Sequence, residues 1–197
     1  MKLLLRSAVV ITLILLAGTC FADQITIQSV TPSSTFFTYD VNNLINGSGL
    51  VGNLHDNDWE HMWITDGTPT GWLIFDLGAV YSLGYASVWN YNAICCGLDR
   101  SVLDMDVLLS NDGVNYTLFG SFVLTEGTGG WIPPDTLALT GASARYIKFN
   151  LNSDYGDPDY IGLSEVQFYG ATTPEPASMV LLGSGVLALA RKLRKRA

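Results

Sequence analysis

The sequence has 197 residues, a formal net charge of −8 and three cysteines. Residues 23–173 hold 17 acidic side chains against three basic ones, a net charge of −14, because most cations lie near the two ends. Nucleic acid is therefore excluded as a partner class, since phosphate binding needs clustered cations. Such an acidic segment instead suits divalent cations and neutral ligands.

The first 22 residues have the composition of a secretory signal peptide. Two cations precede an apolar run at 8–17, and Cys20 and Ala22 supply small residues at the positions that a signal peptidase reads. We therefore expect residues 1–22 to be removed. A lipoprotein anchored through Cys20 is the weaker alternative, because Thr19 stands where such signals need Gly, Ala or Ser.

Residues 23–172 are expected to form one all-β domain. Gly, Asn-Gly, Asp-Gly and Pro-Pro turn signals recur at short intervals, and no long amphipathic helix interrupts them. Alternation supports strands, since Met105, Val107 and Leu109 share one face. About eight short strands predict two packed antiparallel sheets. The expected strands are 25–30, 72–77, 84–92, 103–110, 116–123, 136–139, 145–151 and 163–169.

Cys95 and Cys96 are adjacent, which leaves two interpretations open. They form a vicinal disulfide, or they are two reduced thiols without a structural role. Neither has a catalytic partner in sequence, and no zinc-type CxxC spacing occurs.

Polar and aromatic residues mix at 55–63, as a sugar site requires. A sugar needs an aromatic face for its C–H groups and planar hydrogen-bonding groups for its hydroxyls. His55 and Trp59 are the candidates here, and the alternative is that the tryptophan caps the core. A zinc site of His55, Asp58 and His61 matches no established spacing.

Four further residues complete the ligand-binding candidates. On a strand, Asn90 and Asn92 share one face and point outward or toward a loop, while Trp89 and Tyr91 enter the core. Arg100 offers a planar fork to sugar hydroxyls, or else pairs with a nearby acid. Trp131 stands beside Gly and Pro turn residues, where it either stacks on a ligand or plugs the end of a sheet.

The segment 154–159 brings three carboxylates close together around a Gly bend. They are Asp154, Asp157 and Asp159. Calcium takes six to eight oxygen ligands, so this loop is a candidate calcium site. An exposed acidic turn is the alternative.

No catalytic motif occurs in the sequence. Carboxylates are abundant, so chance pairs are expected, and no nucleophile elbow, HExxH or phosphate loop is present. We therefore expect no enzymatic activity and rank a small hydrolase well below a binding protein.

The C-terminus, residues 173–197, has three consecutive parts. Pro174, Glu175 and Pro176 precede a 14-residue apolar run at 177–190, and five cations follow. The run is shorter than the ~18 residues of a stable membrane span, and the cations would stay cytoplasmic. This order resembles the PEP-CTERM sorting signal of Gram-negative bacteria. The resemblance implies a membrane protease, an exosortase, that cuts near the motif, and membrane contact only through this helix before processing.

Five segments of the central domain together resemble the discoidin, or coagulation-factor type C, domain of the galactose-binding-like superfamily. They are residues 43–47, 72–78, 109–113, 144–149 and 162–170. The resemblance implies a jelly-roll β-sandwich that binds glycans, lipid head groups or proteins without catalysis of its own.

The same resemblance implies a calcium site at Asn46, Ser48 and Glu165. The early Asp-Gly of the family is Asn46-Gly47 here, so the site has one carboxylate fewer. We expect an exported cell-surface or extracellular-matrix protein that binds carbohydrate, with calcium as its candidate cofactor. The alternative is a structural or adhesion component of the matrix that binds protein partners.

Overall fold

The computed structural model describes residues 22–172 and, beyond them, only Gly183, Gly185 and Arg194. Residues 1–21 of the expected signal peptide lie outside the described residues. So do the sorting motif, Pro174, Glu175 and Pro176, and most of the apolar run. Within the described part of the chain, no helix is long and apolar enough to cross a membrane.

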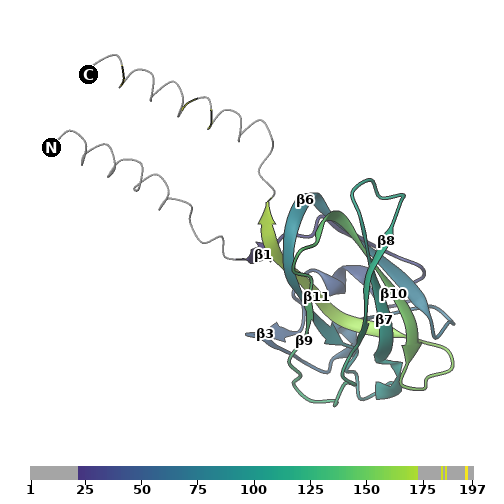
Figure 1. Ribbon diagram of the computed structural model, residues 1–197. Coiled ribbons are helices and arrows are strands. Elements are labelled where there is room, and N and C mark those ends of the chain that lie inside the picture. Colours follow the sequence, from purple (N-terminus) through teal and green to yellow (C-terminus); the bar gives the residue numbers. More distant parts are fainter. Residues whose placement is uncertain (1–21, 173–182, 184, 186–193, 195–197) are drawn as a thin grey trace.

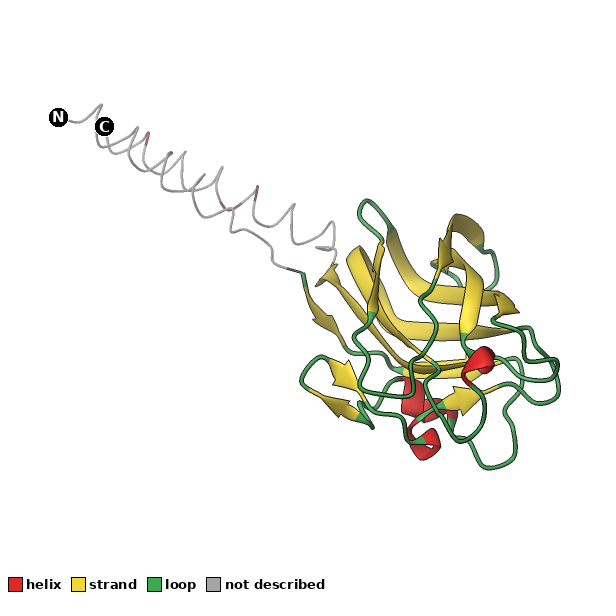
Figure 2. Cartoon of the chain, turned by 90° about the horizontal axis from the view of Figure 1, so that it is seen from below, coloured by secondary structure: helices red, strands yellow, loops and turns green. Residues whose placement is uncertain are grey.

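Between residues 22 and 172 the chain is all-β, and its only helices are three short 3-10 segments, as Figures 1 and 2 show. The 3-10 segments are η1 (Val41–Leu44), η2 (Trp59–His61) and η3 (Leu98–Arg100). The strands are β1 (Asp23–Ile25), β2 (Ser29–Pro32), β3 (Leu50–Val51), β4 (Leu54–His55), β5 (Trp63–Ile64), β6 (Gly71–Asn90), β7 (Val102–Ser110), β8 (Thr117–Val123), β9 (Asp135–Ala138), β10 (Ser143–Asp154) and β11 (Gly162–Thr172).

Strand β6 belongs to both layers of the sandwich. Its first part pairs antiparallel with β2 and β10, and its second part pairs with β9 and β11. The sequence predicted two strands here, at 72–77 and 84–92, and the structure joins them. Gly78 allows this, because it takes a positive φ of 78° that few other residues tolerate. Its N–H is bonded to the carboxylate of Asp76 at 2.7 Å.

The two layers enclose one apolar core. The order β1-β11-β6-β10-β7-β8 forms the hydrogen-bonded path, and β3 pairs separately with β4. Phe75, Phe149 and Phe168 come from β6, β10 and β11, and their ring centroids lie 5.1–5.9 Å apart. The alternation that predicted inward Met105 and Val107 is confirmed, since both are fully buried. Each such side chain contributes roughly 1.5–3 kcal/mol by its burial.

The two ends of the sandwich differ in what they carry. Asp23 pairs with Gly170, and β11 ends at Thr172, so the described termini lie together at one end. At the other end, the first residue of β11, Gly162, pairs with Ile64 and bridges Ser101. Eleven residues of strand separate these ends by about 30 Å. We call the second one the loop end; it carries the loops 56–62, 91–101, 124–134 and 154–161.

Candidate functional site

Arg100 is the central polar group of the loop end. It closes η3, which follows Gly97, a residue with φ of 102°. The Nε atom of Arg100 lies 2.9 Å from Oδ2 of Asp157, and its guanidinium lies 4.6 Å from the centroid of the Tyr160 ring. The side chains of Arg100 and Asp157 are 19% and 11% exposed. The pair is therefore largely buried, but part of each side chain remains accessible to solvent.

Both members of this pair are held in their charged forms. Partial burial opposes the charge on Asp157, but hydrogen bonds from Arg100 and from the N–H groups of Asp159 and Tyr160 lower its pKa. Partial burial likewise opposes the charge on Arg100, yet Asp157 and the nearby Tyr91 hydroxyl raise its pKa. The loop end therefore keeps a planar donor and an acceptor side by side.

Aromatic rings also contact one another at the loop end. Phe36 lies 5.2 Å from Tyr160, and Tyr39 lies 5.4 Å from Trp59, centroid to centroid. The hydroxyl of Tyr39 is 3.1 Å from that of Tyr91. These half-buried rings pack on a small second core of Met62, Ile64, Tyr91 and Ala93. Trp59 is thus partly a core residue and partly a ring available at the surface.

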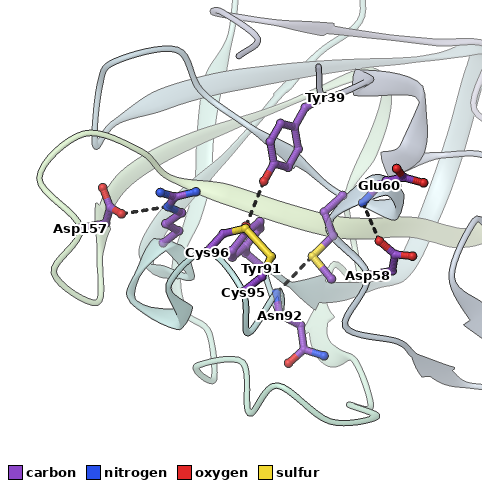
Figure 3. Close-up of a disulfide and its surroundings, with 10 residues drawn as sticks. Tyr39, Asp58, Glu60, Tyr91, Asn92, Cys95, Cys96 and Asp157 are labelled. Atoms are coloured by element: carbon purple, nitrogen blue, oxygen red, sulfur yellow. Dashed lines mark hydrogen bonds and ion pairs between the residues drawn. A yellow bond between two sulfur atoms is a disulfide. The ribbon is translucent and has the colours of Figure 1, made fainter. Parts of the chain in front are cut away.

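The adjacent cysteines form a disulfide, which decides between the two interpretations of the sequence. Cys95 and Cys96 are bonded, with their Cα atoms 3.8 Å apart. The bond lies in the exposed loop that leads from β6 to η3. Figure 3 shows it between Asp157 on one side and Asn92 on the other.

The structure corrects the expectation that Asn90 and Asn92 serve a ligand. Both are buried, and their amides bond to the backbone instead. Asn90 donates to the carbonyls of Val102 and Thr125, and its Oδ1 accepts from the N–H groups of Tyr91 and Val102. Asn92 fixes the neighbouring loop: its Oδ1 accepts from the N–H groups of Thr128 and Gly129, and its Nδ2 donates to the carbonyls of Asp56 and Gly130. The prediction that these amides point toward loops is confirmed. Their role there is structural, because they bond to the loop backbone.

Asn92→Ala is expected to lower the free energy of unfolding by about 3 kcal/mol. The substitution leaves two N–H groups and two carbonyls of a partly buried network without their partner, and each loss is costly. Asn57→Ala is the matched control, since Asn57 is exposed and makes one bond to the same loop, to the carbonyl of Gly129. Urea unfolding measures both, and equal effects of the two variants would contradict the structural role of Asn92.

His55 does not face the loop-end rings either. It is fully buried, and its Nδ1 lies 3.1 Å from the carbonyl of Asp56. Burial lowers its pKa, against the opposing influence of Asp56. His61 pairs with Asp56 at 2.8 Å. No three His, Cys, Asp or Glu side chains converge within the described residues, so the zinc site of His55, Asp58 and His61 is not formed.

Trp131 remains at the surface of the loop 124–134. Its side chain is 55% exposed, whereas the next residue, Ile132, is buried and exchanges backbone hydrogen bonds with His55. Trp131 is therefore not a plug at the end of a sheet.

The residues of the expected calcium site do meet. Glu165 accepts a hydrogen bond from the N–H of Gly47 at 3.2 Å, and Asn46 accepts one from the N–H of Ser48 at 2.8 Å. Asn43 adds its side-chain oxygen, 3.4 Å from both Nδ2 of Asn46 and Oγ of Ser48. Glu165 is only 2% exposed, and burial raises its pKa to about 7. A buried carboxylate among amide, hydroxyl and turn oxygens fits the ligand chemistry of calcium.

The acidic loop at 154–159 does not form the second calcium site. Asp157 is occupied by Arg100, and its Oδ1 accepts from the N–H groups of Asp159 and Tyr160. Asp154 accepts from the N–H of Gly156, and Asp159 is exposed. No metal-binding group of three such side chains occurs in the described part of the chain. The carboxylates shape the turn and position Arg100.

The comparison with family models concerns two parts of the sequence. Residues 53–149 match the model of the NedA-like, galactose-binding domain of the F5/F8 type C group. The chain therefore contains a segment that matches the F5/F8 type C, galactose-binding-like domain over 97 of its 197 residues. Residues 172–195 match the PEP-CTERM protein-sorting motif. No curated protein matches the sequence.

Solved structures share the fold of this F5/F8 type C domain at low identity. The lectin domain of lectinolysin, complexed with Lewis B antigen, is 19% identical, with 76% of this chain and 98% of that chain covered and a TM-score of 0.57. A serum fucolectin of striped bass, Morone saxatilis, is 20% identical over 80% of this chain and 51% of its own, at 0.59. The family 32 module of NanJ from C. perfringens, in complex with galactose, is 17% identical over 75% and 98%, at 0.58.

Sequence reasoning missed the tyrosines of the loop end. Tyr39 and Tyr160 lie far from Arg100 in sequence, and nothing local marks them. The one signal for Tyr39 was the aromatic run at 36–39, which no strand pattern explains. Arg100 pairs with an acid, Asp157, as the alternative for this residue predicted, and sugar binding by its guanidinium stays a prediction.

Proposed function

We propose that this protein is an exported, non-catalytic carbohydrate-binding protein whose glycan site is the loop end around Arg100. One observation carries the proposal: the guanidinium of Arg100 pairs with Asp157 and lies over the ring of Tyr160. Planar donors and acceptors bind the hydroxyls of a sugar, and ring faces bind its C–H groups. The glycans in the lectinolysin and NanJ complexes support this chemistry for the fold.

Binding without catalysis suits the same geometry. Glycoside hydrolysis uses two carboxyl groups, one as the acid and one as the base or nucleophile. Asp157 is instead ionised in a pair with Arg100, and three N–H donors stabilise that state. This arrangement holds a ligand and does not transfer protons.

A glycan array tests the proposal directly. The domain, residues 23–172, is applied with calcium and again with EDTA. Binding in both conditions supports a glycan site that is independent of metal, and binding lost with EDTA indicates a site that calcium holds in shape. Absence of binding to any glycan would overturn the proposal and favour a matrix protein with protein partners.

Calcium is proposed as the structural ion of the cluster formed by Asn43, Asn46, Ser48 and Glu165. When bound, the ion supplies positive charge to the buried carboxylate of Glu165. The residues of the chain position it: η1 and the turn at 46–49 pack onto β11, where Glu165 lies. The cluster is joined to the loop end, because Nδ2 of Asn43 donates to the carbonyls of Glu60 and Met62 at 2.7 and 3.0 Å.

The sorting motif supports export to the cell surface or extracellular matrix of a Gram-negative bacterium. An exosortase-like membrane protease would cut near Pro174, Glu175 and Pro176 after transient anchoring in the inner membrane. The motif follows Thr172 in sequence, and Thr172 lies at the end of the sandwich about 30 Å from the loop end. A protein attached there would present Arg100 outward.

Processing at both termini is expected in a host that has the sorting protease. Mass spectrometry of the exported protein should show a start near Asp23 and the loss of residues beyond Pro176. The same gene expressed in a host without the protease is the control, since only the first cut should occur there. An intact C-terminus on protein exported by the host that has the sorting protease would contradict the sorting proposal.

A further inference from the structure

The loop end carries a second exposed surface next to Arg100. Large apolar side chains are normally buried, so several exposed together mark a contact surface. Trp131 is 55% exposed and Ile94 is 66% exposed. Val51 and Leu54 are also exposed and pair with each other across the β3–β4 hairpin. We call these four residues the apolar strip.

Backbone and side-chain bonds join the strip into one rigid surface. His55 exchanges two backbone hydrogen bonds with Ile132, at 2.9 and 3.0 Å, so the hairpin lies beside Trp131. A Cβ placed on Gly129 would lie 3.0 Å from Ile94, so the loop carrying Trp131 lies directly against Ile94. The strip therefore continues from the hairpin over Trp131 to the start of the disulfide loop.

The loop that carries Trp131 is clamped onto the loop that carries Arg100. Asn92 bonds to three consecutive residues just before Trp131, namely Thr128, Gly129 and Gly130. The N–H of Gly127 donates to Oγ of Ser101, the residue after Arg100, at 3.1 Å. Because the ring of Trp131 is held by a fixed backbone, binding to it costs little conformational entropy.

The disulfide loop lies between the two surfaces. In Figure 3, Asp157 lies to one side of Cys95 and Cys96 and Asn92 lies to the other. Asp157 binds Arg100, and Asn92 holds the loop of Trp131. A ligand anchored at Arg100 that extends across the exposed Cys95 reaches the side of the loop that carries Ile94 and Trp131.

We infer that the ligand is a neutral oligosaccharide chain, with one sugar at Arg100 and a later sugar stacked on Trp131. This inference rests on the proposed glycan site and specifies its substrate class. An exposed indole offers a stacking surface to the C–H face of a sugar. The net charge of −14 in residues 23–173 disfavours an acidic chain and also a second copy of this protein. Neutral sugar units match both the exposed indole of Trp131 and the strongly negative charge of the domain.

The test measures affinity against chain length. An array of neutral monosaccharides and their oligomers of two to six units, with galactose and Lewis b among them, identifies the ligand series. Calorimetry then gives the Kd for each length. We expect the longer members to bind at least about 10-fold more tightly than the monosaccharide, as a well-placed aromatic contact provides.

Trp131→Ala should remove this gain and leave the monosaccharide affinity unchanged. Trp131→Phe keeps a smaller ring and should retain part of the gain. Leu118→Ala is the control, because Leu118 is 57% exposed on β8 and lies outside the loop end. Thermal melting checks that each variant folds.

Each other result overturns the inference in a distinguishable way. Equal affinity at all lengths, or a gain that survives Trp131→Ala, removes the second sugar contact but leaves the glycan site at Arg100. An equal loss for the monosaccharide and the oligomers would place Trp131 within the first contact. Self-association that Trp131→Ala abolishes would make the strip a dimer surface. Absence of binding to every glycan overturns the proposed function and this inference with it.

Discussion

Arg100→Ala is expected to weaken glycan binding by about 30-fold or more while the domain stays folded. This corresponds to about 2 kcal/mol, the size of a hot-spot contact. The substitution removes the planar donor and leaves Asp157 without its partner. Arg100→Lys should also bind poorly, because an ammonium keeps the charge but lacks the fork. Calorimetry with the glycan found on the array measures the effect.

Arg145→Ala provides a closely matched control. Arg145 also pairs with one aspartate, Asp76, at 2.9 Å, and its guanidinium lies 4.8 Å from the centroid of a tyrosine ring, Tyr146. It lies at the start of β10, at the end away from Arg100. This variant should bind the glycan normally. Normal binding by Arg100→Ala, with equal folding of both variants, would place the site elsewhere.

Glu165→Gln is expected to stabilise the calcium-free protein at pH 8 and to have little effect near pH 4.5. Burial raises the pKa of Glu165 from 4.5 to about 7. Between these values the unfolded chain has released the proton and the folded chain has not, so wild-type stability falls as pH rises through this window. At pH 8 the free energies of unfolding of Glu165→Gln and wild type should differ by on the order of 3 kcal/mol, or roughly 10 °C in Tm.

Comparing wild type with Glu165→Gln at each pH isolates the contribution of the Glu165 carboxyl group to stability. Burial lowers the pKa of His55, which acts in the opposite direction near pH 6.5, but His55 is the same in both. Calcium should raise the Tm of the wild type more at pH 8 than at pH 5, because it binds the charged carboxylate. Magnesium should do less, since it demands a tighter octahedral shell.

Two results would count against this account. A difference between wild type and Glu165→Gln that does not change with pH would mean that the carboxyl is well solvated. Equal melting in calcium and in EDTA would eliminate calcium as the structural ion.

The sequence by itself determined the fold class, the family and the sorting motif. Alternation is a local property, so the inward face of β7, with Met105 and Val107, followed directly from the sequence. The family segments also brought Asn46 and Glu165 to one site, although 118 residues separate Glu165 from Gly47, its hydrogen-bond donor. Such a pairing follows from a shared pattern and not from any local signal.

Only the tertiary structure decided what each polar residue does. Asn92 and Arg100 are both polar residues near a loop, and the sequence gives no means to separate a fully buried amide from a partly accessible guanidinium. Burial and hydrogen-bond partners separate them, because Asn92 is enclosed by the loop 124–134 while Arg100 pairs with Asp157 at the surface. The loop 154–159 was a candidate calcium site, with an exposed acidic turn as the alternative. In the structure, Asp157 pairs with Arg100 and accepts from the N–H groups of Asp159 and Tyr160. Arg100 lies 57 residues away in sequence, so no local pattern predicts this pair, and only contacts across the fold bring it together.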